Sequence, residues 1–370
     1  ATNTTDLKDS SRTVVDNISP TASVTYNKPV QEVNGISYYS GKIDVTVQIN
    51  EANFYAEDVD IRVNNKEQAP TNWQQSGDTW TGSITLSGDG DYVITMTYTD
   101  RSTNQMQTYQ SEKIVIDTIN PVINVSYGNG DVKKTAGERQ YFNKVQTATI
   151  SITEHNFRAD DVAAVVTAKD VNGADVSVTD FARYLSNRGN WTRNGDVYSA
   201  NITYDTDANY TFDIDYKDLA LRNAADYKED QFTVDKTAPS NLKISYSEPV
   251  KNQTIGALPY RFSKQLVTVT ISAEDNTSGV EHFVYSYRKA SGVSSVNAEL
   301  IDAALANSQI TKNGSKFTSS FTIPRSALGN SNQFNGTTDF VAHDTATNTT
   351  DLKDSSRTVV DNISPTASVT

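Results

Sequence analysis

Hydrophobic and polar residues alternate with a period of two in several short segments of the chain. Residues 43–50 read IDVTVQIN and residues 267–273 read VTVTISA, so apolar side chains occupy every second position. Successive side chains of a β-strand point to opposite faces, and this alternation is typical of a strand with one buried face. Further strands of the first 117 residues are predicted near 21–26, 59–63, 79–86, 92–98 and 110–116. The sequence has no sustained helical period, which indicates an all-β chain.

The two ends of the sequence are identical. Residues 1–25 and residues 346–370 both read ATNTTDLKDSSRTVVDNISPTASVT, an offset of 345 residues. Because an identity of this length does not arise by chance, we interpret the chain as one period of a tandem array, cut slightly long. Residues 346–360 are then predicted to form the last strand of the final domain, and residues 1–15 are a second copy of that strand.

A shorter repeat lies within the long one. An apolar residue, an Asp, three further residues and a Pro recur at Asp16, Asp117, Asp235 and Asp361, in steps of 101, 118 and 126 residues. Each step suits one β-sandwich domain, and Pro suits a stiff linker because it fixes φ and restricts the preceding residue. The predicted segments are 1–16 (the final strand of a preceding repeat), domains at 17–117, 118–235 and 236–361, and 362–370 (the start of the next repeat).

The second domain repeats the first and carries an insert. The sequence EANFYAEDV at 51–59 returns as EHNFRADDV at 154–162. The 20-residue interval from Asp58 to the next Gly-Asp pair becomes 35 residues in the second domain. Within the added segment, residues 179–185 (TDFARYL) are predicted to form one or two helical turns after Thr179 as the cap.

The third domain is a more divergent version of the same unit. Its final hairpin has the same length as the other two, because 17 residues separate a late Asp from the linker Asp in all three domains. Its own insert, at 297–307, is rich in Ala and Leu, which favours a helix.

These linkers, the Ser-Gly-Val at 278–280 and the DTATN turn at 344–348 resemble those of bacterial immunoglobulin-like repeats. The turn at 100–104 lacks the Ala, and the turn that begins at Asp218 has one residue more before Asn223. The resemblance implies three tandem immunoglobulin-like β-sandwiches in an elongated array, with short helical inserts in domains 2 and 3. Such repeats occur in large surface proteins and adhesins, so it also implies an extracellular location on a bacterial cell surface.

Charge and composition exclude several classes of partner. The net charge of −13 argues against nucleic acid and against an anionic membrane surface, since both require a basic patch. The chain has no Cys, which removes disulfides and thiolate chemistry, and it has no apolar run long enough for membrane insertion. The histidines, at His155, His282 and His343, do not recur at matching positions, and no nucleophile elbow or phosphate loop is present. Spacing alone leaves a paired-carboxylate hydrolase open, but a repeat array without a unique pocket predicts a non-enzymatic protein.

Aromatic residues at repeated positions have two interpretations. Trp73, Trp80, Trp191 and Tyr198 could stack on sugars, but large aromatic side chains usually fill sandwich cores. We therefore predict that Trp80 and Tyr198 are core residues and that the other two are at least half-buried. Tyr92 and Tyr210 each follow a polar turn, and both are predicted to be tyrosine corners.

Acidic residues at the predicted domain entrances are the candidate site. In an immunoglobulin-like sandwich, the loops after the second and sixth strands lie at the pole where the chain enters, next to the linker Asp. The three predicted sets are Asp16, Glu51 and Asp100; Asp117, Glu154 and Asp218; and Asp235, Asp275 and Asp344. One interpretation is a structural Ca²⁺ at each junction, and no other cofactor is expected. The other, which the sequence favours, is that these carboxylates accept backbone N–H bonds within turns.

Two functions remain open at this level. As a stalk, the array projects a distal adhesive tip; as an adhesive module, each unit binds a host protein or a glycan, and repetition adds avidity. A host immunoglobulin, bound by a superantigen-like repeat, is one such ligand, although no residue points to it. The inserts of domains 2 and 3 slightly favour binding, because a pure spacer does not need them. In both cases the chain is expected to be a monomeric rod.

Overall fold

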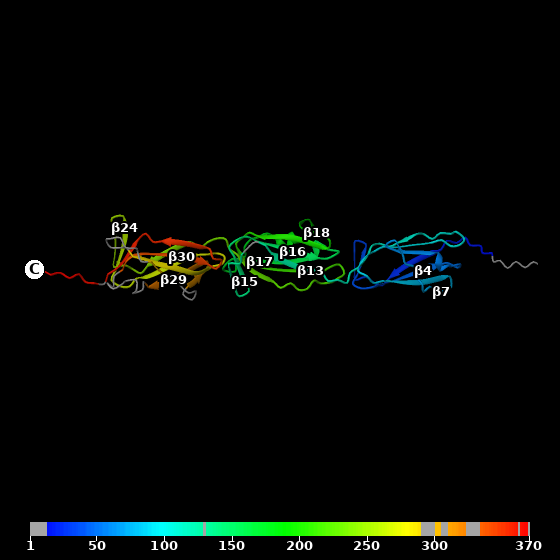
Figure 1. Ribbon diagram of the computed structural model, residues 1–370, viewed down its shortest axis with the longest axis horizontal. Coiled ribbons are helices and arrows are strands. Elements are labelled where there is room, and N and C mark those ends of the chain that lie inside the picture. Colours follow the sequence, from blue (N-terminus) through cyan, green and yellow to red (C-terminus); the bar gives the residue numbers. More distant parts are fainter. Residues whose placement is uncertain are drawn as a thin grey trace, which may run out of the picture. The chain divides into compact units, whose positions relative to one another are not determined.

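The computed structural model describes residues 13–128, 131–289, 300–304, 310–322, 334–361 and 363–368. Strands dominate each of the three domains, which confirms the predicted all-β class (Figure 1). The described helices are short: α1 (Phe181–Leu185), η1 (Ala56–Asp58), η2 (Ala159–Asp161) and η3 (Arg188–Asn190). None of the helices among the described residues is long and apolar enough to cross a membrane.

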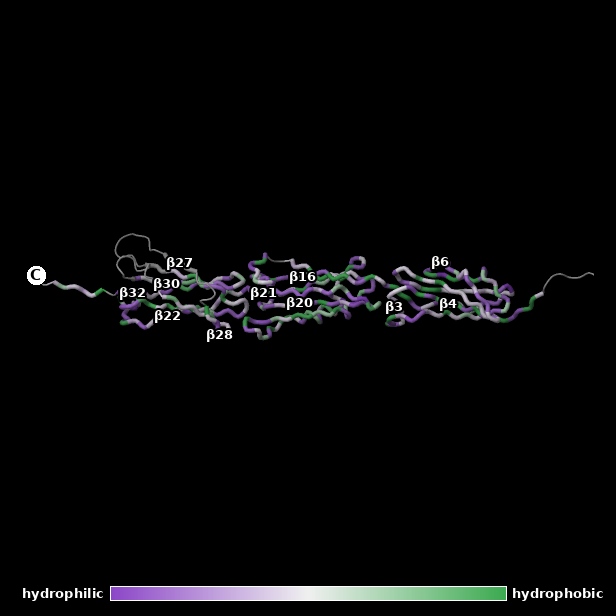
Figure 2. Tube along the Cα trace, turned by 90° about the horizontal axis from the view of Figure 1, so that it is seen from below, coloured by the Kyte–Doolittle hydropathy of each residue, from purple (hydrophilic) through white to green (hydrophobic). Residues whose placement is uncertain are grey.

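The first domain is a sandwich whose two layers share one core. One layer has the strand order β1 (Thr21–Tyr26), β4 (Ile43–Asn50), β8 (Thr79–Leu86) and β7 (Gln74–Ser76). The alternation predicted for β4 is observed, since Ile43, Val45, Val47 and Ile49 are fully buried and the side chains between them are not. Figure 2 shows hydrophobic and hydrophilic positions interleaved along the strands.

The facing layer of the first domain contains two short sheets. Their orders are β11 (Tyr109–Gln110), β10 (Ile94–Tyr98), β5 (Val59–Val63), β6 (Lys66–Glu67), and β2 (Gln31–Val33), β3 (Ile36–Tyr39), β12 (Ile114–Ile116), β9 (Gly90–Tyr92). The first strand is thus divided, because β1 pairs antiparallel with β4 while β3 runs parallel to the last strand, β12. This division between two layers is an immunoglobulin-like arrangement.

The second domain has the same order of strands. One sheet is β13 (Val122–Tyr127), β16 (Gln146–Thr153), β19 (Val197–Tyr204) and β18 (Thr192–Asn194). The other is β14 (Lys134–Ala136), β15 (Arg139–Phe142), β21 (Asp230–Val234), β20 (Ala208–Tyr216) and β17 (Val162–Lys169). The predicted helical turn is α1, but its cap is Asp180 rather than Thr179, because the Asp180 carboxylate accepts a hydrogen bond from the backbone N–H of Arg183 at 3.0 Å.

The third domain is also a sandwich of two sheets. The first is β22 (Ser240–Tyr246), β25 (Thr268–Glu274), β29 (Lys316–Thr322) and β28 (Ile310–Asn313). The second is β23 (Lys251–Ile255), β24 (Leu258–Ser263), β32 (Arg357–Val360), β30 (Phe334–Asp344), β26 (Val280–Lys289) and β27 (Leu300–Ala304), with β31 (Thr349–Lys353) on β30. The prediction that residues 346–360 contribute the last strand is confirmed by β31 and β32. Of its second copy, residues 1–12 lie outside the described residues.

The predicted helix at 297–307 is wrong where the structure describes it. Residues 300–304 form β27, which pairs antiparallel with β26 in the register Val284↔Ala304 to Arg288↔Leu300. The edge of β26 offers a continuous row of backbone partners, and pairing there outweighs the modest helix preference of Ala and Leu. The remainder of the predicted helix lies outside the described residues.

The aromatic predictions hold except at Trp80. Tyr198 and Trp191 are each 4% exposed, and Trp73 is half-buried. Trp80 is also only half-buried: it is the second residue of β8, before the buried positions of that strand begin at Gly82, and Phe54 stacks on it at 4.8 Å. Both predicted tyrosine corners are confirmed. Tyr92 Oη donates to the carbonyl of Gly88 at 2.6 Å, and Tyr210 Oη donates to that of Thr206 at 2.8 Å.

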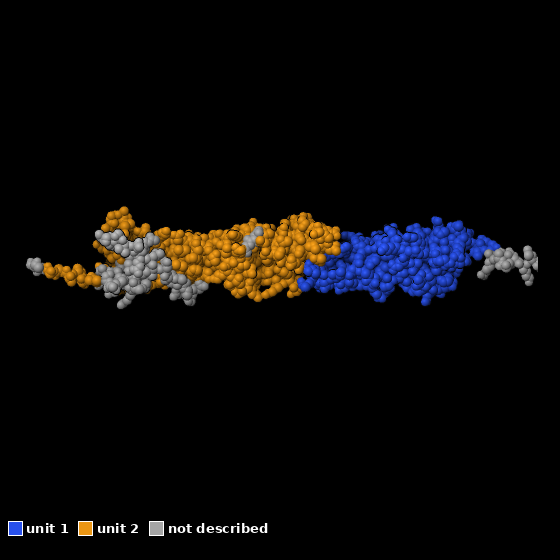
Figure 3. Space-filling view, viewed as in Figure 1, with its two compact units in different colours: residues 1–122, 154–157, 216–225 blue, residues 123–153, 158–215, 226–370 orange. Residues whose placement is uncertain are grey.

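The chain divides into two compact units (Figure 3). The first comprises residues 1–122, 154–157 and 216–225. The second comprises residues 123–153, 158–215 and 226–370. Each of the three predicted carboxylate sets lies within a single unit: the first two sets belong to the first unit, and the third set belongs to the second unit.

Candidate metal centres

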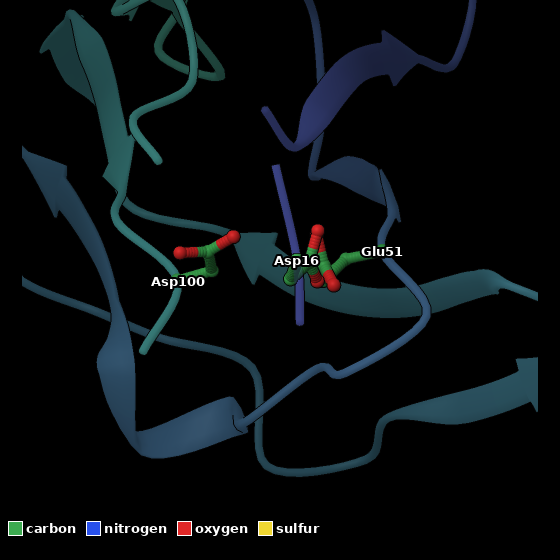
Figure 4. A group of neighbouring side chains, drawn as sticks. All are labelled: Asp16, Glu51 and Asp100. Atoms are coloured by element: carbon green, nitrogen blue, oxygen red, sulfur yellow. The ribbon is translucent and has the colours of Figure 1, made fainter. Parts of the chain in front are cut away.

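The structure brings together all three predicted carboxylate sets. In each set, one oxygen from every member lies within 4.8 Å of an oxygen of the other two. The members are Asp16, Glu51 and Asp100; Asp117, Glu154 and Asp218; and Asp235, Asp275 and Asp344. Figure 4 shows the first set, with the carboxylates of Asp16 and Glu51 beside each other and that of Asp100 turned toward them. The nine sequence predictions are therefore correct about proximity.

Backbone contacts fix the linker Asp of each set. The backbone N–H of Asp117 donates to the carbonyl of Tyr39 at 2.9 Å, and that of Asp235 donates to Phe142 at 2.9 Å. One carboxylate oxygen then accepts the N–H two residues later, as in Asp117 with Ile119 at 3.1 Å. Asp16, Asp235 and Asp361 accept in the same way at 3.0–3.1 Å. Each linker carboxylate is thus oriented by an Asx turn in its own segment of the chain, independently of the loops that carry the other two acids.

The loop acid of each set is likewise held by backbone donors. Glu51 Oε1 accepts the N–H of Asn53 at 2.7 Å, and Glu154 Oε1 accepts that of Asn156 at 2.8 Å. Asp275 Oδ1 accepts two donors, from Thr277 at 3.0 Å and Gly279 at 2.6 Å. One oxygen of each acid is therefore occupied, as the turn-carboxylate interpretation predicts.

The late-turn acids of the first and third sets have a partner that the sequence analysis did not identify. Asp100 accepts both the backbone N–H and the side-chain Nδ2 of Asn104, each at 2.8 Å. Asp344 has the same two contacts with Asn348, also at 2.8 Å. The sequence signal for this contact is the Asn at the end of the DTATN turn, Asn348, and its counterpart Asn104.

The late turn of the second set, which begins at Asp218, differs from the other two by a substitution. It has the same length as they have, although its sequence predicted one residue more. The Asp218 N–H donates to the carbonyl of Arg222 at 2.9 Å, just as Asp100 donates to Asn104 at 3.0 Å. Arg222 therefore occupies the Asn position, and Asn223 is one residue beyond the turn, in a bridge with Lys217. The prediction of a longer turn is wrong because the backbone hydrogen bonds, and not the alignment of the two Asn residues, define the turn.

Burial and mutual repulsion raise the pKa of most of these acids. Burial, followed by the charge of Asp117, accounts for the raised pKa values of Glu154 and of Asp218, the latter reaching about 6. In the third set, burial and the neighbouring carboxylates raise the pKa of Asp235 to about 6 and that of Asp344 to about 7. The carboxylates are therefore costly to ionise together, and protons or a cation would relieve the repulsion.

The first set is the least strained electrostatically. Burial raises the pKa of Glu51, whereas the side-chain hydrogen bond from Asn53, at 2.9 Å, lowers the pKa of Asp16. Asp16 is the most open of the three residues, and its charge is favoured by the donors that face it. The three acids offer only oxygen atoms as metal ligands, and oxygen ligands suit a hard divalent cation such as Ca²⁺.

The three carboxylate sets contain no histidine, although His155 and His343 are chain neighbours of Glu154 and Asp344. His282 and His343 face each other across β26 and β30, with parallel rings 4.4 Å apart. Burial lowers the pKa of both rings. His155 Nε2 lies 3.8 Å from a carboxylate oxygen of Asp91. The three histidines therefore occupy different positions in their domains, which agrees with the sequence analysis.

No family model matches the sequence, and no curated protein is significantly similar to it. Among solved structures, a D1–D4 ectodomain fragment of ICAM-5 is 10% identical, with 91% of this chain and 76% of that chain covered and a TM-score of 0.37. Dimeric latent PorU from Porphyromonas gingivalis is 11% identical, with 92% and 34% covered and a TM-score of 0.22. At these scores the similarities add no inference about function.

Proposed function

We propose that the chain is a non-enzymatic repeat unit of a bacterial surface protein, in which immunoglobulin-like domains form a stalk and Ca²⁺ fixes their linkers. The observation that supports this best is the recurrence of one carboxylate arrangement at three domain entrances. In each, the linker Asp meets an acid from the loop after the second strand and an acid from a late turn. A cation bound there connects the linker to the following domain.

Hydrogen bonds satisfy part of each set but leave its charge in place. One oxygen of each linker Asp and each loop acid has a backbone donor, yet three carboxylates still share a space with oxygens within 4.8 Å. Neutral N–H donors reduce the repulsion, whereas a divalent cation reverses its sign. The raised pKa values of Asp218, Asp235 and Asp344 indicate the remaining cost.

Calcium is the cation that this chemistry favours. Ca²⁺ takes six to eight oxygen ligands in flexible geometry and accepts carboxylates, carbonyls and water together. No His belongs to any of the three sets, and the chain has no Cys, so the donors that favour zinc or copper are missing from them. Three carboxylates supply part of the six to eight oxygen ligands of Ca²⁺, and water supplies the rest.

Calorimetric titration of the full chain with Ca²⁺, together with melting in Ca²⁺ or EDTA, tests the proposal. We expect saturable binding and a melting temperature that rises with Ca²⁺, because a ligand that binds only the folded state stabilises it. A variant with Asp16→Asn, Asp117→Asn and Asp235→Asn should lose both effects. Asp60→Asn is the matched control, since Asp60 is a surface carboxylate paired with Arg62 outside the three sets. A chain without binding heat and with an EDTA-insensitive melt would leave only the hydrogen-bond interpretation.

Adhesion to a host ligand is the second candidate function, and its support is the insert of domain 2. The insert builds α1 and places Trp191 Nε1 2.7 Å from the carbonyl of Leu185, a contact with no counterpart at Trp73. A stalk does not require such an addition. Exposure of the full chain to serum proteins and to a glycan array distinguishes the candidates: retention of a host immunoglobulin or a glycan supports a binding module, and retention of neither supports a stalk.

A further inference from the structure

We infer that the three sites are not equivalent, and that the Asp117, Glu154 and Asp218 site is the one that requires the cation. This inference rests on the proposed Ca²⁺ binding. At the other two sites an Asn side chain already connects the linker to the late turn. At the second site that Asn is replaced by Arg222, and a cation is left to make the connection.

The Asn bridge is the same at the first and third sites. Asn104 Nδ2 donates to Asp100 Oδ2 at 2.8 Å and to the backbone carbonyl of Asp16 at 3.2 Å. Asn348 Nδ2 donates to Asp344 Oδ2 at 2.8 Å and to the carbonyl of Asp235 at 2.8 Å. One amide group therefore ties the late-turn carboxylate to the linker backbone, with both of its N–H groups used.

Arg222 cannot repeat this bridge because its side chain is directed elsewhere. Its Nη2 donates to the carbonyl of Ser40 at 3.1 Å. The neighbouring Leu219, 5% exposed, packs in a small apolar cluster with Tyr38 and Val115. The turn is therefore anchored to β3 and β12. The guanidinium lies near enough to Asp218 to lower the pKa of that carboxyl group, but the hydrogen bond that its Nη2 makes is to Ser40 and not to the linker.

The missing donor leaves an unpartnered oxygen in the second site. Asp218 is 3% exposed, and its Oδ1 accepts the backbone N–H of Arg222 at 2.7 Å. Its Oδ2 is buried without a hydrogen-bond partner in the part of the chain that the structure describes. The corresponding oxygens of Asp100 and Asp344 both have one. A buried carboxylate oxygen without a donor, beside two other acids, is the feature that a bound cation satisfies.

The occupant is a hard divalent cation and not a second organic group. The space is bounded by three carboxylates, so an anion is excluded, and a neutral donor would leave the excess negative charge in place. The partner is therefore Ca²⁺ or a cation of similar size and hardness, and the second site should bind it more tightly than the first and third. At those sites the Asn amide already uses one carboxylate oxygen that the metal would otherwise coordinate.

Amide hydrogen exchange of the full chain, in Ca²⁺ and in EDTA, measures the protection of the late turn of each site separately. With Ca²⁺ at 100 times its dissociation constant, the amides of residues 218–225 should exchange up to about 100-fold more slowly than in EDTA. Residues 100–106 and 344–350 should change much less, because their Asn bridges remain in EDTA. Calorimetry of the same protein should show one site tighter than the others, and that site should disappear in Asp218→Asn but persist in Asp100→Asn.

The variant Arg222→Asn restores the missing bridge, and Arg222→Lys is its control because it keeps a cation without an amide. In EDTA, Arg222→Asn should protect residues 218–225 to the level of the other two turns, whereas Arg222→Lys should not. Ca²⁺ binding with equal affinity and equal protection at all three turns would overturn the inference while leaving the proposed function intact. Loss of the tight site in Asp100→Asn alone would also overturn it. Absence of any Ca²⁺ binding would overturn both.

Discussion

Without metal, the third domain is expected to lose stability as the pH rises from about 5 to about 8. The folded protein holds Asp235 and Asp344 at pKa values of about 6 and about 7, above the usual value of 3.8. A carboxyl group whose pKa is raised by folding binds its proton more tightly in the folded state. Its contribution to stability is greatest while it stays protonated, and is lost as the pH rises through the folded pKa.

The pKa of Asp344 gives the magnitude. The unfolded carboxyl group is already ionised at pH 5, so the loss between pH 5 and the folded pKa of about 7 spans about two pH units, or about 3 kcal/mol at about 1.36 kcal/mol per pH unit. Asp235 and Asp344 repel each other, so their contributions overlap and the total stays near this value. For a domain of this length, a loss of about 3 kcal/mol lowers the melting temperature by on the order of 10 °C.

Differential scanning calorimetry of the full chain in EDTA, from pH 5 to pH 8, measures this loss. The variant Asp235→Asn/Asp344→Asn is the comparison, because its amides do not titrate. The comparison is needed since burial lowers the pKa of His282 and His343, and these rings make stability fall at low pH instead. The difference between the two proteins isolates the carboxylates. Saturating Ca²⁺ should remove the decline, because the metal binds the ionised form.

Two results would refute the reasoning. A melting temperature of the third domain that is flat or rises between pH 5 and pH 8 in EDTA, relative to the amide variant, would show that the carboxylates are not destabilised by their proximity. An equal decline in Ca²⁺ and in EDTA would show that the metal does not bind at this set.

Three further predictions concern packing and assembly. Tyr198→Ala should destabilise the second domain by about 3–5 kcal/mol, whereas Trp80→Ala should destabilise the first domain by about half as much because Trp80 is only half-buried. Urea unfolding measures both losses of stability, and equal losses would contradict the difference in burial. Small-angle scattering should give the dimensions of a monomeric rod of roughly 120 Å, three sandwiches of about 40 Å each by strand rise, and a sphere-like radius of gyration would exclude it. Deletion of residues 1–15 should leave every melting transition unchanged and should remove any strand-exchanged dimer. The reason is that the tethered copy of this segment in β31 and β32 has the higher effective concentration. Loss of stability in the third domain would show instead that the N-terminal copy supplies the last strand of that domain.

The sequence was sufficient for the strands and for the location of the acids. Alternation at 43–50 determines which side chains face a core, because the period of a strand is fixed by backbone geometry. The recurring linker Asp predicted where each domain begins, and the geometry of the sandwich poles then predicted that Glu51 and Asp100 lie beside Asp16, as they do. These inferences needed local periodicity and topology, both of which a sequence carries directly.

Only the tertiary structure decided how the sites differ. That Asn104 and Asn348 bridge two segments, and that Arg222 instead points to Ser40, depends on contacts between residues distant in the chain. The strand at 300–304 and the half-exposure of Trp80 have the same origin, since each depends on what lies beside the residue and not on its own preference. Propensities amount to less than about 1 kcal/mol per residue, and a pairing edge or an incomplete neighbour easily outweighs them.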